Sequence, residues 1–108
     1  MPTNAKDDPV MIRFRQALDA IDGNHNFERI ILFGSRARGD SQLDSDYDIA
    51  VFIKNFGGLL KEIQRLAAIS TDILMDTGKV ISAKPFRAED YETKTAFMRN
   101  LRRDGACL

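Results

Sequence analysis

Residues 27–53 read FERIILFGSRARGDSQLDSDYDIAVFI, with one apolar run near each end. The apolar run 30–33 is β-branched and aromatic and too short for a helix of its own, which predicts a buried strand that ends at Gly34. A second apolar run, 47–53, predicts another strand. Between the two runs lie a glycine–serine turn, two arginines and several aspartates. We therefore expect two strands joined by a polar loop that carries charged side chains.

The turn at Gly34 and Ser35 has the properties of a phosphate-binding loop. Glycine tolerates backbone angles that other residues avoid and lets a ligand approach closely. Ser35 suits the start of a short helix, whose free backbone N–H groups attract phosphate. The guanidinium of Arg36 or Arg38 could grip a triphosphate. Pairing with the aspartates of the loop is an equal alternative for both arginines, and nearness to the turn slightly favours Arg36 for the phosphate role.

Asp46 and Asp48 stand at the start of the second strand. Alternation along a strand puts both on one face, and Tyr47 and Ile49 on the other. Mg²⁺ takes oxygen ligands and is commonly held by one or two carboxylates plus substrate phosphates. The alternative is an exposed, inert pair of acids. With the phosphate loop beside them, the two carboxylates favour phosphoryl or nucleotidyl transfer, in which catalysis is mostly positioning and charge neutralisation.

The two motifs together resemble a known signature. Gly34-Ser35, ten residues, then Asp46-Tyr47-Asp48 is similar to the signature of the DNA-polymerase-beta-like nucleotidyltransferase superfamily. The fuller text, GSRARG at 34–39 and SDYDIAV at 45–51, resembles its small bacterial and archaeal branch, the minimal nucleotidyltransferases. The tail at 99–105 also resembles the ends of many of these proteins, so the resemblance covers the chain from about residue 11 onward.

The resemblance implies an α/β fold, a small mixed β-sheet with helices packed on it. It also implies transfer of a nucleoside monophosphate, most plausibly AMP from ATP, to an acceptor with Mg²⁺. Gly34 and Ser35, with Arg36 beside them, would hold the β- and γ-phosphates. Asp46 and Asp48 would be the catalytic residues and would ligate one or two Mg²⁺ ions.

The resemblance further implies a partner protein. Many minimal nucleotidyltransferases are encoded with a helical HEPN protein, often an RNase toxin. The nucleotidyltransferase is then the antitoxin, and some neutralise the toxin by adenylylating one of its tyrosines. The family therefore suggests a protein adenylyltransferase of a toxin–antitoxin system.

One part of the family pattern is missing. Many members carry a third carboxylate on the third strand, where it helps activate the attacking hydroxyl, whereas this chain offers Ser82 there and no acid. Asp72 and Asp76 fall in an expected helix, where a solvated face is their favoured role. A binding module that neutralises its partner by masking it, without chemistry, is therefore the alternative. Modification of tRNA or of a small molecule is less favoured, because we expect no further domain to bind an acceptor.

The rest of the chain completes an α/β pattern. The expected elements are a helix capped by Asp8 and running to Ile21, a helix at 58–77 closed by Gly78, a strand at 79–86, and a last helix that opens at 88–90 and ends before Gly105. The inner face of the last helix is expected to carry Tyr91, Lys94 or Thr95, Met98 and Leu101.

Size and composition set the outer limits. The 108 residues predict one nucleotidyltransferase domain over 1–108, with 1–8 mobile. Sixteen basic and sixteen acidic residues give zero net charge, which disfavours nonspecific nucleic-acid binding. Cys107, the one cysteine, excludes an internal disulfide framework and a cysteine-based zinc site. There is no apolar stretch of the roughly 20 residues that a membrane span needs, and the polar N-terminus is no signal peptide, so we expect a cytoplasmic protein.

Overall fold

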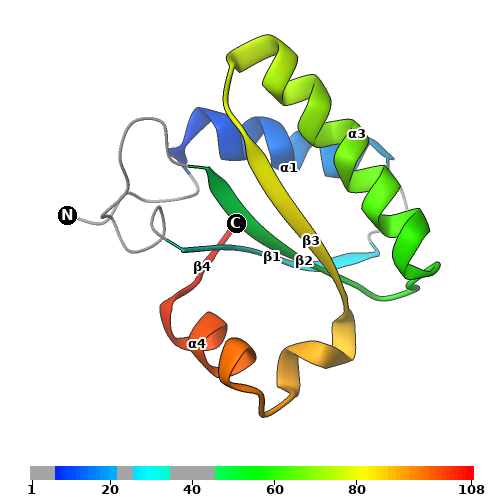
Figure 1. Ribbon diagram of the computed structural model, residues 1–108, viewed down its shortest axis with the longest axis vertical. Helices are drawn as coiled ribbons and strands as arrows, with labels where there is room; N and C mark the ends of the chain where they lie inside the picture. Colours follow the sequence, from blue (N-terminus) through cyan, green and yellow to red (C-terminus); the bar gives the residue numbers. More distant parts are fainter. Residues whose placement is uncertain (1–6, 22–25, 35–45) are drawn as a thin grey trace.

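A computed structural model of the chain describes residues 7–21, 26–34 and 46–108 (Figure 1). Its sheet has the strand order β3-β2-β1-β4, with β1 antiparallel to both β2 and β4, and β2 parallel to β3. The strands are β1 (Phe27–Phe33), β2 (Tyr47–Ile53), β3 (Ile81–Arg87) and β4 (Ala106–Cys107). The helices are α1 (Pro9–Ile21), α3 (Leu59–Thr77), the 3-10 helix η2 (Ala88–Glu92) and α4 (Ala96–Asp104). A mixed sheet with helices packed on it confirms the α/β fold predicted from the sequence.

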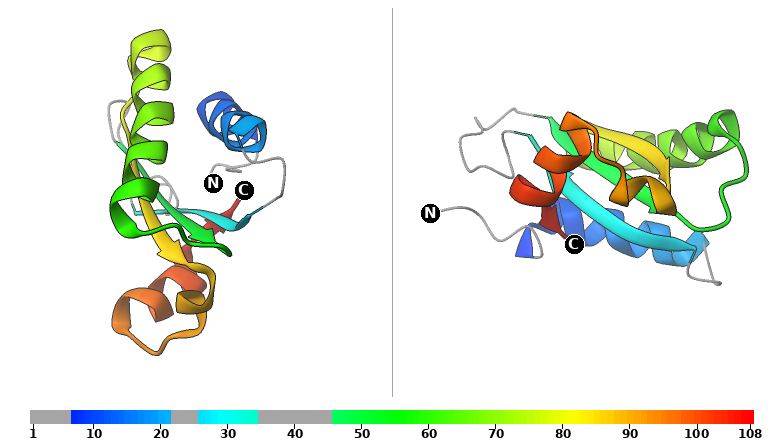
Figure 2. Two further views of the ribbon diagram at one scale, coloured as in Figure 1. Left: turned by 90° about the vertical axis from the view of Figure 1, so that its right-hand side faces the viewer. Right: turned by 90° about the horizontal axis from the view of Figure 1, so that it is seen from below.

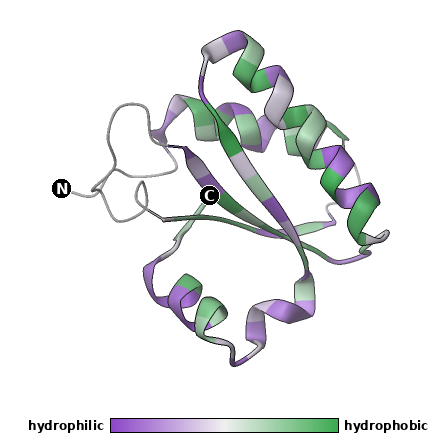
Figure 3. Ribbon diagram, in the orientation of Figure 1, coloured by the Kyte–Doolittle hydropathy of each residue, from purple (hydrophilic) through white to green (hydrophobic). Residues whose placement is uncertain are grey.

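The helices divide between the two faces of the sheet. Figure 2 shows α4 separated from α1 and α3 by the strands. On the face of α1 and α3, the larger core cluster is built from Met11, Phe14, Leu18, Ile30, Leu32, Tyr47, Ile49, Val51, Ile53, Leu66, Ile69, Ile73 and Ile81. On the face of α4, the smaller cluster is built from Ile31, Ala50, Phe52, Met98 and Leu101. Figure 3 shows hydrophobic residues along the strands and, interspersed with hydrophilic ones, along the helices.

Strand β2 lies between two other strands and is covered on both faces, so every residue from Ile49 to Ile53 is buried. Tyr47 and Ile49 point to the α1/α3 side, whereas Ala50 and Phe52 point to the α4 side. Since side chains alternate along a strand, Asp48 shares the α4 side with Ala50. The predicted alternation thus holds for the buried residues of β2, and it assigns Asp48 to the side opposite Tyr47 and Ile49.

The ends of the first two helices follow the sequence signals. Asp8 caps α1, its Oδ1 accepting from the backbone N–H of Val10 at 2.8 Å and of Met11 at 3.4 Å. Its Oδ2 accepts from the hydroxyl of Tyr47 at 2.9 Å, which ties the helix start to β2. Helix α3 ends at Gly78, which is left-handed at φ 74° and donates to the carbonyl of Leu74 at 2.8 Å. Of the predicted mobile segment 1–8, residues 1–6 lie outside the described residues.

The end of the chain differs from the prediction. The single helix expected from Ala88 is two elements, because the backbone is extended at Thr93 and Thr95, between η2 and α4. Thr95 caps α4 by accepting from the backbone N–H of Met98 at 3.1 Å. The guanidinium of Arg102 donates to the carbonyls of Tyr91 and Thr93, which fixes the interruption through a contact from the following helix.

Candidate functional site

Gly34 and Asp48 meet where β1 ends and β2 begins. In the antiparallel register, Phe33 of β1 is opposite Asp48 of β2, so the turn that follows β1 lies beside this carboxylate. Gly34 adopts a left-handed backbone with φ 78°. A Cβ atom added there would lie 2.6 Å from Oδ2 of Asp48, closer than two such atoms can approach. The backbone angle therefore favours glycine, and any side chain at this position would have to displace the carboxylate packed against the turn.

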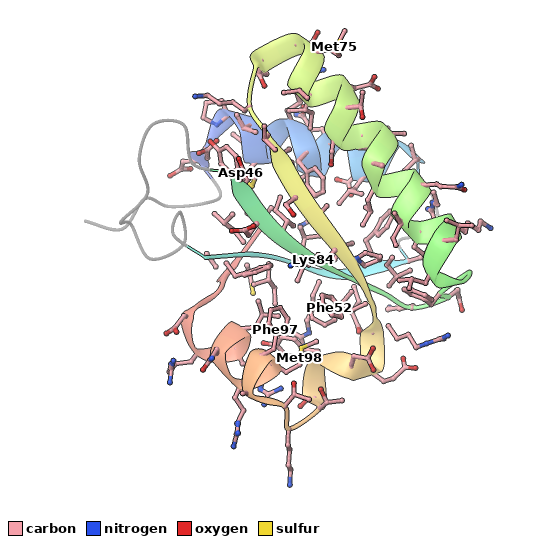
Figure 4. The ribbon with its side chains drawn as sticks, in the orientation of Figure 1. Asp46, Phe52, Met75, Lys84, Phe97 and Met98 are labelled. Atoms are coloured by element: carbon pink, nitrogen blue, oxygen red, sulfur yellow. The ribbon has the colours of Figure 1, made fainter. Side chains whose placement is uncertain are left out.

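Asp46 immediately precedes β2 and is exposed, whereas Asp48 is half-buried on the α4 side of the strand. Figure 4 shows Asp46 at the start of β2. The backbone N–H of Tyr47, between the two acids, donates to the carbonyl of Val80 at 2.9 Å, which joins the start of β2 to the chain entering β3. Within the described residues, neither carboxylate takes part in a hydrogen bond or an ion pair. Both remain available as oxygen ligands.

Two of the predicted site residues lie outside the part of the chain that the structure describes. Ser35 and Arg36 fall outside the described residues, as do Arg38 and the aspartates of the same loop. Their phosphate contacts stay predictions. Of the predicted set, the structure thus brings Gly34 against Asp48 and leaves Asp46 exposed at the start of the same strand.

Strand β3 supplies Ser82 and Lys84 to the face that carries Asp48. In the parallel register, Ser82 is beside Asp48 and Lys84 is beside Ala50. The stacked rings of Phe52 and Phe86, with centroids 5.3 Å apart, mark the same face further along the two strands. The Nζ atom of Lys84 lies 5.9 Å from the ring centroid of Phe33 (Figure 4). A cation and a hydroxyl therefore stand where a third acid was expected.

The other candidates for a third acid are remote from the site. Asp72 and Asp76 are exposed on α3, which packs on the opposite face of the sheet, and Asp76 forms an ion pair with Arg13 of α1. Across the described residues, no three His, Cys, Asp or Glu side chains gather into a metal-binding group. An all-protein metal cage is thus absent from this part of the chain.

The residues present nevertheless fit a magnesium ion shared with a substrate. Mg²⁺ prefers oxygen ligands and usually keeps several waters, needing one or two carboxylates plus substrate phosphates. Asp46 and Asp48 provide hard oxygen ligands at the start of the central strand β2. Because Gly34 has no side chain, the Asp48 carboxylate can lie directly against the turn. This donor set suits a cation that arrives with phosphate rather than a permanent structural ion.

The site has a neighbour that the sequence patterns did not indicate. A cavity of about 150 Å³ lies beside Gly34, between the end of β1 and α4. It is lined by Phe33, Gly34, Phe97, Asn100, Leu101 and Asp104. Phe97 precedes Met98 of the predicted inner face of the last helix but is not part of that face. The only sequence signal for this cavity was an aromatic residue next to that face.

None of the described helices combines the length and the apolar character needed to cross a membrane.

Comparison with known proteins gives a family and a fold. A search of curated proteins finds no match. Among solved structures, the crystal structure of a candidate nucleotidyltransferase from Sulfolobus solfataricus superimposes with a TM-score of 0.59 at 16% sequence identity, covering 99% of this chain and 87% of that one. This likeness supports the fold. The family model of the polymerase beta nucleotidyltransferases matches residues 16–108. The chain therefore belongs to the polymerase beta nucleotidyltransferase family.

Proposed function

We propose that this protein is a Mg²⁺-dependent nucleotidyltransferase that moves AMP from ATP to a protein acceptor, a helical toxin of the HEPN type. The observation that carries the proposal is the contact of Gly34 with Asp48, where a Cβ atom would lie 2.6 Å from the carboxylate oxygen. It puts a turn suited to phosphate next to a carboxylate suited to magnesium. Family membership supports the transfer chemistry, and the resemblance to minimal nucleotidyltransferases suggests the protein acceptor.

In this proposal each residue has one task. Gly34, Ser35 and Arg36 hold the β- and γ-phosphates, and Asp46 and Asp48 hold the magnesium. A bound Mg²⁺ would neutralise the charge of the triphosphate and of the departing pyrophosphate. The acceptor hydroxyl oxygen forms a bond to the α-phosphorus, and the bond from that phosphorus to the bridging oxygen of the β-phosphate breaks. Pyrophosphate leaves, and the hydroxyl proton passes to a base of the acceptor or to water.

A second candidate function is masking of the partner without chemistry. Ser82 and Lys84 on the site face of β3 favour it, because neither supplies the carboxylate that many relatives place on that strand. The surface of α3 favours it too, since several large apolar side chains there are exposed. They are Leu59, Leu60, Ile63, Leu74 and Met75. Met75, which is 81% exposed, is marked in Figure 4. Such a surface could cover a partner protein while the nucleotide site stayed idle.

Labelled ATP separates the two functions. The protein is incubated with Mg²⁺ and its candidate HEPN-type partner, once with ATP labelled at the α-phosphate and once with ATP labelled at the γ-phosphate. Transfer of AMP labels the partner from the α-position and leaves it unlabelled from the γ-position. Asp48→Asn should abolish the label, whereas Asp72→Asn, an exposed acid on the opposite face, should leave it unchanged.

The remaining outcomes decide against transfer. Tight association without label, unchanged in Asp48→Asn, would support masking instead. Label that enters from the γ-position would mean phosphoryl transfer and contradict the proposed reaction. A partner that neither binds nor becomes labelled would contradict both candidates for that acceptor.

A further inference from the structure

We propose that the cavity beside Gly34 binds the adenine ring of the nucleotide. The base pocket, as we name it, is the 150 Å³ space lined by Phe33, Gly34, Phe97, Asn100, Leu101 and Asp104. The inference rests on the proposed nucleotide binding at Gly34 and Asp48, and extends it from the phosphates to the base. It assigns to α4 the selection of the nucleotide.

The location of the base pocket ties it to the phosphate site. Gly34 lines the pocket and also contacts the carboxylate of Asp48. Phe33, which forms another wall, is the register partner of Asp48 across the two strands. A ligand whose phosphates lie over the turn would therefore have this cavity within its own length.

The size of the base pocket suits a ring and excludes a whole nucleotide. Sites that enclose a drug-sized ligand measure roughly 300–1,000 Å³. At about 150 Å³ this cavity is smaller and can hold one flat heterocycle, with sugar and phosphates outside it. That division matches a substrate whose charged part is held by the turn and by magnesium, and whose base is held separately.

Phe97 gives the base pocket an aromatic wall. The residue is 38% exposed although it belongs to α4, whose Met98 and Leu101 are buried against the sheet. The ring is held edge-to-face by Phe33, with centroids 5.5 Å apart, and lies tilted against Phe86 at 5.7 Å. Figure 4 shows Phe97 between the sheet and α4. A ring fixed by two neighbours, with part of its surface still open, is a preformed stacking platform.

Asn100 gives the base pocket a polar group that can read the edge of a base. It follows Phe97 by three residues and so lies on the same side of α4. Its Oδ1 accepts from Nη2 of Arg103 at 3.2 Å, which orients the carboxamide. Within the described part of the chain, no hydrogen bond uses its Nδ2 donors. Since the carbonyl oxygen keeps a second lone pair, the group can donate to N7 and accept from the N6 amino group of adenine.

Arg103 is in turn held in place by Asp104. Its Nε and Nη2 donate to the two carboxylate oxygens of Asp104 at 3.1 and 3.0 Å. The hydrogen bond and the negative charge of Asp104 both raise the pKa of the Arg103 guanidinium. Hydrogen bonds at the exposed end of α4 thus connect Asp104 through Arg103 to Asn100.

Calorimetric titration of the full chain with magnesium and five ligands tests the inference. The ligands are ATP, GTP, CTP, UTP and inorganic tripolyphosphate, which has the phosphates without the base. We expect ATP to bind about tenfold tighter than tripolyphosphate, because the base gains stacking on an aromatic side chain. GTP, CTP and UTP should bind more weakly than ATP, because their edges do not match the carboxamide of Asn100.

Two variants of α4 make the test specific. Asn100→Ala removes an exposed side chain and should reduce the preference for ATP over GTP several-fold, while the affinity for tripolyphosphate stays unchanged. Phe97→Leu keeps apolar contact with Phe33 and should lower the affinity for ATP to nearly that for tripolyphosphate. Phe97→Tyr keeps the ring and should bind ATP as the wild type does. Gln64→Ala, an exposed amide on α3, is the matched control and should change nothing. Circular dichroism confirms that each variant is folded.

The outcomes separate this inference from the proposed function. If the wild type binds tripolyphosphate and ATP equally, the base pocket is wrong and the phosphate site stands. The same holds if Phe97→Leu leaves the ratio of these two affinities unchanged, or if Asn100→Ala leaves the ratio of the ATP and GTP affinities unchanged. If the wild type binds neither ligand with magnesium, the proposed function fails, and the base pocket with it.

Discussion

Gly34 and Gly78 differ in why a glycine stands at each position. A glycine can be needed for its backbone angle or for the space that a side chain would fill. Both are left-handed, with φ of 78° and 74°. A Cβ atom at Gly34 would collide with the carboxylate of Asp48, whereas one at Gly78 would meet no atom within 4 Å. The backbone requirement is therefore shared, and the requirement for space next to a carboxylate belongs to Gly34 alone of the two.

Alanine at each position tests this distinction. A side chain in the left-handed region costs roughly 1–2 kcal/mol, so Gly34→Ala and Gly78→Ala should both lower the free energy of unfolding by about that amount in urea titrations. In Gly34→Ala the new methyl group also displaces the Asp48 carboxylate, and binding of ATP with magnesium should weaken at least about tenfold, some 1.4 kcal/mol. Gly78→Ala should bind like the wild type. Wild-type binding by Gly34→Ala would show that the close contact has no role in the site.

Among the elements, α1 and β2 are joined at a single carboxylate. Asp8 caps the helix with one oxygen and accepts from Tyr47, next to the site aspartates, with the other. The start of the helix and the start of the strand are thus held together. The N-terminal end of α1 consequently supports the segment that carries Asp48.

Replacement of the two partners should distinguish these contacts. Asp8→Ala removes both and should lower the free energy of unfolding by about 1–2 kcal/mol, the upper part of the range for loss of a helix cap. Tyr47→Phe keeps the cap, removes the hydrogen bond to Asp8, and should cost about 0.5–1.5 kcal/mol. Chemical denaturation measures both. A Tyr47→Phe variant less stable than Asp8→Ala would contradict the assignment of the larger effect to the cap.

Several element limits and one contact of the site could be predicted from the sequence. The limits of 47–53 and the end of α3 at Gly78 follow from local signals, namely an apolar run and a C-cap glycine. The contact of Gly34 with Asp48 could also be expected, since both stand at the loop-facing ends of adjacent strands. Local patterns did not predict the interruption before α4, because it depends on hydrogen bonds from Arg102 to carbonyls nine and eleven residues earlier.

The base pocket was beyond local patterns for a related reason. Strand β4 has two residues, too few to show any periodicity, yet it pairs with Ile31 and Leu32 of β1. The backbone N–H of Leu108 extends this pairing by donating to the carbonyl of Ile30 at 2.9 Å. This pairing helps hold α4, the preceding helix, beside the end of β1, where Phe97 lines the cavity with Gly34. Sequence alone does not bring residues 34 and 97 together.

In the molecule as a whole, the larger hydrophobic core and the candidate site lie on opposite faces of the sheet. The larger core cluster lies between the sheet and the two helices α1 and α3, and includes the fully buried Phe14. The face with Asp48, Ser82 and Lys84 is only partly covered by α4 and η2. One face therefore supplies most of the buried apolar surface, and the other is left for a ligand.

A core truncation on the α1/α3 face tests that separation. Phe14→Ala should lower the free energy of unfolding by about 3–5 kcal/mol and the melting temperature by at least about 10 °C. Arg13→Ala removes an exposed residue that pairs with Asp76 and should cost no more than about 1 kcal/mol. Below its melting temperature, Phe14→Ala should still bind ATP with magnesium. Loss of binding in a folded Phe14→Ala protein would mean that the two faces are coupled.

The claim on which the rest depends is that Gly34 and Asp48 together form a magnesium–nucleotide site. The most direct test is calorimetric titration of ATP into the wild type and Asp48→Asn, each with Mg²⁺ and with EDTA. We expect the wild type to bind ATP with Mg²⁺, and to bind it at least about tenfold more weakly without Mg²⁺, and we expect Asp48→Asn to lose this dependence. An affinity for ATP that is the same in all four titrations would contradict a magnesium–nucleotide site at Gly34 and Asp48.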